Sequence, residues 1–299
     1  MRVSERQRYD TVGQRIESAK DANKSMLEEL STQKRINVIS DDPLGSPKSI
    51  RLKEKIGTIG QYQKNIDYST GFLERSESAV QGLNDNLIRA KELAVAMAND
   101  TYDARSREAS AREVREIIEE VVQVGNTSYN NRFVFAGFRN QTPPLSLDGK
   151  YLGDDGSIFL QTSDAKFQQI NIQARHLFEA TPEDAQKGHF NMLDTLTGLF
   201  HGLMDNDKDA LYKMLDELDY QIEKTSSYQA TIGGMWTSLN QTGRRLEKDD
   251  ELSRAALSEI EDADIYKATS DFKRTETVLQ STLLASNKLL QPSLMNFLQ

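Results

Sequence analysis

Apolar residues recur at alternating steps of three and four near both ends of this chain. Near the N-terminus, the residues at this spacing are Tyr9, Val12, Ile16, Ala19, Asn23, Met26 and Leu30. Near the C-terminus, steps of three, four or seven connect Ile265, Ala268, Phe272, Leu279, Leu283, Leu290, Leu294 and Phe297. Such spacing is typical of the seam along which one helix packs against another. Neither segment has a second apolar face, so each requires a partner: the other end of the same chain, or the same ends of neighbouring copies.

The same period predicts long helices along most of the chain. The first is expected from about residue 4 to 35, where Asn23 places a polar group on the seam and could fix its register. Pro43 and Pro47 then interrupt it, and the Ser and Asp residues before them are good helix caps. Further helices are expected at about 47–98, 104–124, from near 190, and from 207 toward 260, followed by the C-terminal helix, which Pro292 should bend.

The pattern changes between Tyr129 and Gly188. Residues 132–137 read as a short strand, and Pro143-Pro144 marks a boundary. Beyond it the apolar period is two, and Gly153-Asp-Asp-Gly156 is a good hairpin turn between two short apolar runs. This segment of roughly forty-five residues is small for a core of its own. We therefore expect it to be dispensable for folding of the helices.

These patterns predict a mainly α fold. It should be an elongated helical bundle or coiled coil formed by N- and C-terminal arms, with a small β-rich insert in the middle. Residues 1–45 and 260–299 would form a terminal coiled-coil region for assembly. Residues 46–137 and 190–259 would form a rod of long helices, and residues 138–189 would form the outward-facing insert.

Composition narrows the class of protein. Hydrophobic residues make up 37% of the 299 residues, charged residues make up 28%, and the net charge is −9. A nucleic acid is an unexpected partner for such an acidic chain. The absence of cysteine excludes disulfides and thiol chemistry. No run approaches the roughly eighteen apolar residues of a membrane span, and the first ten residues do not resemble a secretory signal.

Candidate chemical sites are weak. His176, His189 and His201 lack the spacing of helical zinc ligands. The residues that resemble a calcium loop, namely Asp205, Asp207, Asp209 and Asp216, lack the required glycine and glutamate, and they are better explained as an acidic helix N-terminus. Trp236 is expected in the core. We predict no catalytic residue, no cofactor and no metal, and therefore no enzyme.

Mixed charges between Arg105 and Glu116 permit two interpretations. Acidic and basic residues alternate there on one predicted helix. The simpler interpretation is a solvated face with pairs along the helix. The alternative is a face that forms salt bridges between subunits.

Three stretches resemble the bacterial flagellins. They are Leu30-Ser-Thr-Gln-Lys-Arg-Ile-Asn37 with Ser40-Asp-Asp42, then the segment from Arg89 to Thr101, and then Ile260-Glu-Asp-Ala-Asp-Ile-Tyr-Lys-Ala-Thr269. They occur in the order expected for the two arms of a flagellin-like chain. The positions that carry the resemblance are Arg35, Ile36, Asn37, Asp41, Asp42, Arg89, Glu92, Leu93, Asp262, Ala263 and Asp264.

Within that superfamily, four segments are more similar to the hook–filament junction branch than to the filament subunit. They are Met1-Arg-Val-Ser4, Asn131–Phe138, Tyr151–Gly156 and Ser293–Leu298. The resemblance implies a structural adaptor whose identical subunits form a ring. Its partners would be the first hook-associated protein, flagellin and a flagellar export chaperone, without membrane insertion.

The resemblance also implies a location. Such a chain would be extracellular in the bacterial flagellum, exported by the flagellar type III channel without a Sec signal. The two alternatives are the filament flagellin subunit itself and a cytosolic coiled-coil scaffold.

Overall fold

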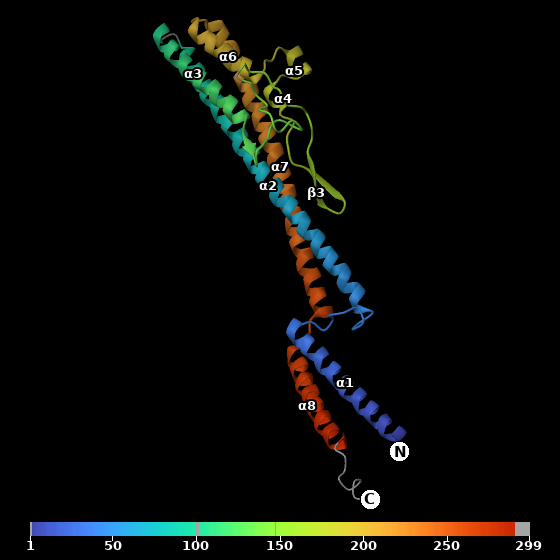
Figure 1. The fold of residues 1–299 in the computed structure, drawn as a ribbon. Helices are drawn as coiled ribbons and strands as arrows, with labels where there is room; N and C mark the ends of the chain where they lie inside the picture. The colour runs from blue at the N-terminus through green and yellow to red at the C-terminus, as the bar shows by residue number, and fades with distance from the viewer. Residues whose placement is uncertain (1, 100–101, 147, 291–299) are drawn as a thin grey trace, which may run out of the picture. The chain divides into compact units, whose positions relative to one another are not determined.

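A computed structural model describes residues 2–99, 102–146 and 148–290 (Figure 1). The chain divides into two compact units. Residues 1–58 with 248–299 form the first, and residues 59–247 form the second. The three-part division expected from the sequence stays a prediction, because these units cut two long helices rather than separating helices from strands.

The first unit is built from helices at both ends of the chain. Helices α1 (Arg2–Thr32) and α8 (Ile265–Leu290) lie side by side, as Figure 1 shows. The first turns of α2 (Gly45–Met97) and the last turns of α7 (Lys208–Glu261) complete the unit. Asp264 caps α8, because its Oδ1 accepts the N–H groups of Tyr266 at 3.0 Å and Lys267 at 3.1 Å.

Helix α2 begins two residues earlier than the prolines indicate. The Oδ1 atom of Asp42 accepts the N–H groups of Leu44 and Gly45 at 3.1 and 2.8 Å. This carboxylate therefore caps the helix, and Pro47 sits in the first turn, where a missing N–H leaves no helical bond unmade. The expected end at about residue 98 agrees with Met97.

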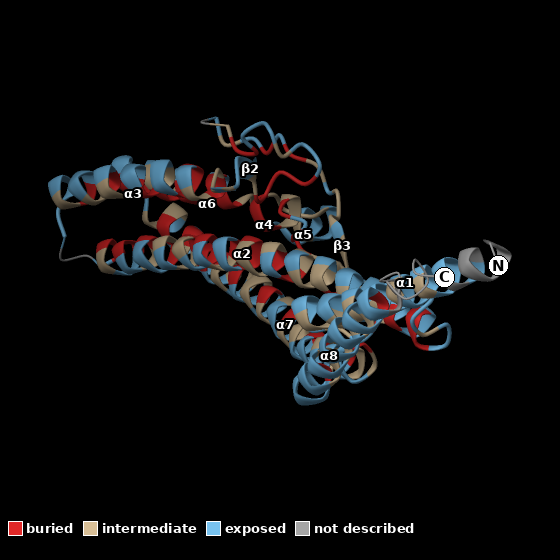
Figure 2. Ribbon diagram, turned by 60° about the horizontal axis from the view of Figure 1, so that its bottom comes forward, coloured by how far each residue is buried: buried red, intermediate tan, exposed pale blue. Residues whose placement is uncertain are grey.

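The second unit is a helical bundle with one continuous apolar core. Helix α3 (Ala104–Gly125) packs on α6 (Met192–Met204), and both contribute to the same core as the central parts of α2 and α7. Figure 2 shows the buried residues as stripes along these helices. The buried apolar residues are Ile59, Ile66, Leu73, Val80, Leu83, Leu87, Ala90, Ala94 and Met97 on α2 and Leu211, Leu218, Ile232, Leu239 and Leu246 on α7.

Two small antiparallel sheets and two short helices connect α3 to α6. Strands β1 (Ser128–Tyr129) and β2 (Arg132–Phe133) form one sheet, and β3 (Phe159–Ser163) and β4 (Lys166–Gln169) form the other. The short helices are α4 (Arg175–Phe178) and α5 (Pro182–Lys187). The prediction of a mainly α fold with packed terminal arms and a small β-rich insert is confirmed.

The hairpin expected at Gly153–Gly156 is wrong. Tyr151 pairs instead with Leu145, and its hydroxyl donates to the carbonyl of Phe135 at 2.6 Å. The Oδ1 atom of Asp154 accepts the N–H of Phe138 at 2.7 Å. The polar turn residues thus fold back onto the end of the first arm, and the true hairpin, β3–β4, follows them.

The insert also shares the core of the bundle, contrary to the expectation that it is dispensable. Phe178 is buried, and its ring lies 5.8 Å from that of Phe135 and 6.2 Å from that of Tyr151. Leu145 and Ile170 belong to the same cluster as the helices. A segment too short for its own core has become part of its neighbour's core.

The expectation for Trp236 is wrong as well. Its side chain is 40% exposed, whereas Ile232 and Leu239 are buried and Met235 is partly buried. One position in a helix is a rotation of about 100°. The tryptophan therefore lies beside the seam rather than on it.

Candidate assembly surface and polar junction

The α1–α8 seam is the pairing of the two terminal arms. On α1 its half-buried residues are Val12, Ile16, Ala19, Asn23, Met26 and Leu30, the set expected from the sequence. On α8, Ala268 is buried, and Phe272, Thr275 and Leu279 are half-buried. The Nδ2 atom of Asn23 donates to Oγ1 of Thr275 at 3.4 Å. The two arms of one chain therefore serve as partners for each other.

Part of the predicted interface lies outside this seam. Tyr9 is 56% exposed, Ile265 is 52% exposed and Leu283 is 40% exposed. The side chain of Leu290 and the residues Leu294 and Phe297 lie outside the part of the chain that the structure describes.

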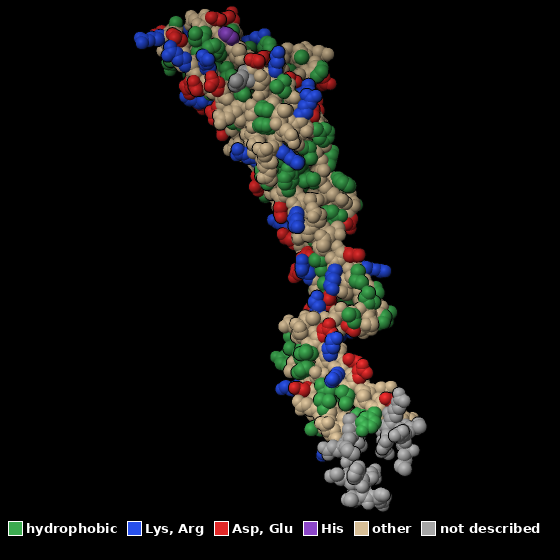
Figure 3. Space-filling model, viewed as in Figure 1, with side chains coloured by type: hydrophobic (Ala, Val, Ile, Leu, Met, Phe, Trp, Pro, Cys, Tyr) green, Lys and Arg blue, Asp and Glu red, His purple; other side chains and the backbone are tan. Residues whose placement is uncertain are grey.

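The paired helices keep apolar surface on their outer faces. Leu27 is 53% exposed on α1, and Val278 and Leu284 are 52% and 67% exposed on α8. In Figure 3, hydrophobic side chains lie among charged ones on α8. A groove of about 620 Å³ between the two helices is lined largely by small side chains, namely Thr11, Ser18, Ala19, Ala22, Ala285 and Ser286, with others. Surface of this kind is typical of a protein–protein contact.

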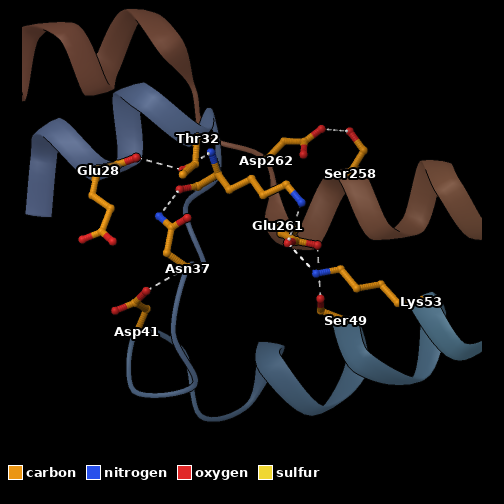
Figure 4. A network of polar contacts seen from close by, with 10 residues as sticks. Glu28, Thr32, Asn37, Asp41, Ser49, Lys53, Ser258, Glu261 and Asp262 are labelled. Atoms are coloured by element: carbon orange, nitrogen blue, oxygen red, sulfur yellow. Dashed lines mark hydrogen bonds and ion pairs between the residues drawn. The ribbon is translucent and has the colours of Figure 1, made fainter.

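A buried carboxylate connects the arms at the end of the seam (Figure 4). Glu261, the last residue of α7, is 3% exposed. Its Oε1 lies 3.0 Å from Nζ of Lys34 and 2.7 Å from Nζ of Lys53, and its Oε2 accepts the hydroxyl of Ser49 at 3.2 Å. We call these four residues the junction network. It binds the loop after α1, the start of α2 and the end of α7 to one another.

Backbone bonds reinforce the junction network. The N–H of Arg35 donates to the carbonyl of Glu261 at 2.7 Å, and the N–H of Ala263 donates to the carbonyl of Gln33 at 3.0 Å. The guanidinium of Arg35 also donates to the carbonyl of Ile260 at 2.7 Å. Two flagellin-like stretches that are more than 220 residues apart in sequence thus form one site.

Electrostatics keeps the Glu261 carboxylate ionised. Burial raises its pKa, but hydrogen bonds and charge from Lys53 and Lys34 outweigh burial, so that the pKa is lowered from its ordinary 4.5. The two ammonium groups remain partly exposed. One ionised carboxylate therefore pairs with two ammonium groups at the point where three segments meet.

The other N-terminal motif residues shape the loop between α1 and α2. The Oδ2 atom of Asp41 accepts the N–H groups of Asn37 and Val38, both at 2.9 Å, and these bonds lower the pKa of Asp41. The Oδ2 atom of Asp42 pairs with the guanidinium of Arg35 at 3.3 Å. The pKa of Asp42 is lowered chiefly by the N–H of Gly45. Ile36, which belongs to this loop, is buried.

The remaining motif residues have different positions. Asp262, an exposed residue, accepts the hydroxyl of Ser258. Arg89 belongs to the second unit, where it pairs with Glu92 at 3.1 Å and with Glu113 of α3 at 2.7 Å. Leu93 is 8% exposed in the core of that unit. These residues of the middle motif hold α2 and α3 together.

The weak chemical candidates have structural contacts. His189 pairs with Glu217 at 3.0 Å and stacks on Tyr220. The Oδ1 atom of Asp207 accepts the N–H groups of Asp209 and Ala210, so it caps α7 as the simpler interpretation expects. Among the described residues there is no cluster of His, Cys, Asp or Glu that could hold a metal ion, and no helix within them is long and apolar enough to cross a membrane.

Sequence reasoning missed the junction network. Glu261 lies inside the C-terminal motif, yet nothing in its neighbours predicts burial of a carboxylate. A usable signal was the pair Ser49 and Lys53, which are four positions apart on one helix face.

Some of the mixed charges of α3 pair along that helix. Arg112 lies 2.7 Å from Glu108, and Arg115 lies 3.8 Å from Glu119. Figure 3 shows acidic and basic side chains interspersed over α3. The interpretation as a solvated face accounts for these pairs.

The fold and the seam together define a class: a helical protein whose two terminal arms pair. Residues 3–140 match the bacterial flagellin N-terminal helical region, and residues 215–298 match the bacterial flagellin C-terminal helical region. These matches span well over half of the sequence. The chain belongs to the bacterial flagellin family, whose members are structural proteins of the flagellum.

Individual relatives include both junction and filament proteins. The chain is 24% identical to flagellar hook-associated protein 3 of Escherichia coli K12, over 86% of this chain and 87% of that protein. It is 25% identical to a flagellin of Listeria monocytogenes, over 86% of this chain and 84% of that protein.

Solved structures support the fold. Bacillus cereus FlgL superposes with a TM-score of 0.60 at 21% identity, covering 70% of this chain and 99% of that one. The flagellar junction protein FlgL of Legionella pneumophila gives a TM-score of 0.60 at 14% identity, covering 72% and 99%.

Proposed function

We propose that this chain is a structural adaptor of the flagellum that joins the hook to the flagellin filament. The observation that carries the proposal is the α1–α8 pair. Its two helices cover each other's seam residues, and they still expose Leu27, Val278, Leu283 and Leu284. Similarity to hook-associated protein 3 of E. coli along most of both chains supports the junction role.

In this proposal, identical subunits form a ring through the outer faces of their terminal arms. Residues 1–45 and 260–299 are the assembly region, and the junction network fixes where the arms leave α2 and α7. The first hook-associated protein contacts one side of the ring and flagellin contacts the other. An export chaperone covers the arms before the chain is exported to the cell exterior.

The second candidate function is the filament subunit itself. It is favoured by the similarity to the Listeria flagellin, which has nearly the same identity and coverage. A cytosolic coiled-coil scaffold is the third candidate. Both flagellar candidates predict that the protein is found outside flagellated cells and is retained in export-deficient ones.

Deletion of the gene separates junction from filament. The junction role predicts hooks without filaments and flagellin shed as monomer into the medium, with recovery on complementation. Electron microscopy of the cells and immunoblots of the medium measure both. Hooks that still carry filaments after the deletion would refute the junction role, and loss of the major filament protein itself would establish the second candidate.

A further inference from the structure

The pair formed by α2 and α7 in the second unit is covered on one side by the β3–β4 hairpin. On α2, the hydroxyl of Tyr62 donates to Asp164 at 3.0 Å, and Nδ2 of Asn65 donates to the carbonyl of Gln161 at 2.8 Å. On α7, Ser238 accepts a hydrogen bond from Nζ of Lys166 at 2.8 Å. The hairpin thus holds both helices from one side.

The other side of the same helix pair is an open groove of about 620 Å³. Three of the residues that line it, Thr70, Gly71 and Gly243, are small. The charged residues of its lining are three carboxylates, from Asp67, Glu74 and Glu247, and one guanidinium, from Arg244. We call this surface the acidic groove. The Nδ2 atom of Asn240, which also lines it, is buried without a hydrogen-bond partner among the described residues.

The chain also carries a surface of opposite charge. Lys48, Arg51 and Lys55 are exposed, and they recur at steps of three and four, so they share one face of the first turns of α2. None of the three forms an ion pair with a described residue, whereas Lys53, which lies on another face, pairs with Glu261. We call these three residues the basic stripe.

The two surfaces match in spacing. Lys48 and Lys55 are seven residues apart, as are Asp67 and Glu74, which corresponds to about 10.5 Å along a helix. The small residues Thr70 and Gly243 in the lining permit close approach of a helix. Exposed ion pairs contribute little affinity individually, but a matched set fixes register and partner.

We propose that the acidic groove of one copy is filled by the basic stripe of a second copy. The inference rests on the self-assembly in the proposed function, and it names the surfaces of one lateral contact. Since the two surfaces differ, the contact is heterologous and leaves a free groove and a free stripe for further copies. A ring or a helical layer follows from such a contact, whereas a closed dimer does not.

The absence of cysteine permits a clean cross-linking test. Full-length Arg51→Cys and Thr70→Cys, which mark the centres of the stripe and the groove, are co-expressed in the deletion strain. Isolated flagella are treated with a short bis-maleimide. The expected product is a covalent dimer that contains both variants. The control pairs Thr70→Cys with Gly57→Cys, which is on another face of α2, where an added Cβ meets no atom within 4 Å.

Charge reversal provides the second arm of the test. Lys48→Glu with Arg51→Glu and Lys55→Glu should reduce retention of filaments several-fold. So should Asp67→Lys with Glu74→Lys and Glu247→Lys, and the two sets combined in one chain should restore it. A cross-linked yield equal to that of the control, or no rescue by the combined set, overturns this contact. If the cysteine variants still carry filaments, the proposed function is unaffected by that result. Filaments that persist on the deletion strain refute the proposed function instead.

Discussion

At the scale of single residues, a buried charge holds the ends of the chain together. Glu261 is almost completely buried, yet two ammonium groups and a hydroxyl satisfy its oxygens. Desolvation of a carboxylate is unfavourable unless such partners are present. The same residue at an exposed helix end would contribute little. Its partners come from two other segments, so the carboxylate fixes where three segments meet.

Glu261→Gln should weaken the first unit by about 1–2 kcal/mol at neutral pH, because hydrogen bonds to a charged group are stronger than those to an amide. The folded pKa is below the ordinary 4.5. The stabilisation by the charge is therefore fully present above about pH 5 and is lost as the pH falls through the folded pKa. Urea unfolding of both proteins between pH 3 and 8 should show the difference shrinking at the acid end.

Glu259→Gln is the matched control, because Glu259 is exposed on the same helix two positions away. It should leave the unfolding free energy nearly unchanged at every pH. A difference between wild type and Glu261→Gln that persists undiminished at pH 3 would contradict the role of the ionised carboxylate.

At the scale of elements, the α1–α8 seam leaves part of the apolar surface of α8 exposed. Leu279 is half-buried in the α1–α8 seam, whereas Leu283, one turn later, is 40% exposed. The spacing of apolar residues in the sequence places both residues in one assembly stripe. The structure divides them, because a seam against one helix uses only part of the apolar circumference.

Leu283→Asp should change the unfolding free energy of the monomer by no more than about 0.5 kcal/mol. In an assembly it would bury an unpaired carboxylate, which costs several kcal/mol. Cells with this variant should make hooks, export the protein and shed flagellin. Leu279→Asp should instead destabilise the monomer by about 1–3 kcal/mol. Thermal melts and immunoblots of the medium measure both effects, and normal filaments on Leu283→Asp would remove Leu283 from the interface.

The insert is the second element whose role depends on packing. Phe178→Ala should destabilise the second unit by about 3–5 kcal/mol, because its buried ring contacts Phe135 and Tyr151. Phe159→Ala, at a position that is 55% exposed on β3, should change stability by less than about 0.5 kcal/mol. Calorimetry of both variants tests this; equal melting temperatures would restore the view that the insert is dispensable.

At the scale of the whole molecule, the ends of the chain fold as one element. Helix α1 buries apolar side chains only on the face that pairs with α8, and isolated helices are marginal in water. A chain that stops at Asp264 should therefore lose the helical signal of α1 as well as that of α8. Circular dichroism at a fixed concentration measures the loss. A decrease limited to the 26 residues of α8 would show that α1 is stable alone.

The sequence by itself determined the helices, their seams and the family. The spacing of apolar residues predicts a seam such as that of α2, or that of α1 from Val12 to Leu30. A helix must bury its apolar face whichever partner covers it, so the spacing is visible without knowledge of the partner. The motifs at Arg35 and Asp262 were visible as sequence. Pro47 and Asp207 also act locally, at the starts of α2 and α7.

Only the tertiary structure decided which partners those surfaces meet. Glu261 is buried because Lys34, Ser49 and Lys53 approach it from segments distant in sequence, and no local pattern encodes that approach. Tyr151 and Phe178 join the bundle core for the same reason, since a short apolar run is compatible with a hairpin of its own or with a neighbour's core. Period fixes which face of an element is apolar, whereas burial and polar pairing depend on contacts between distant residues.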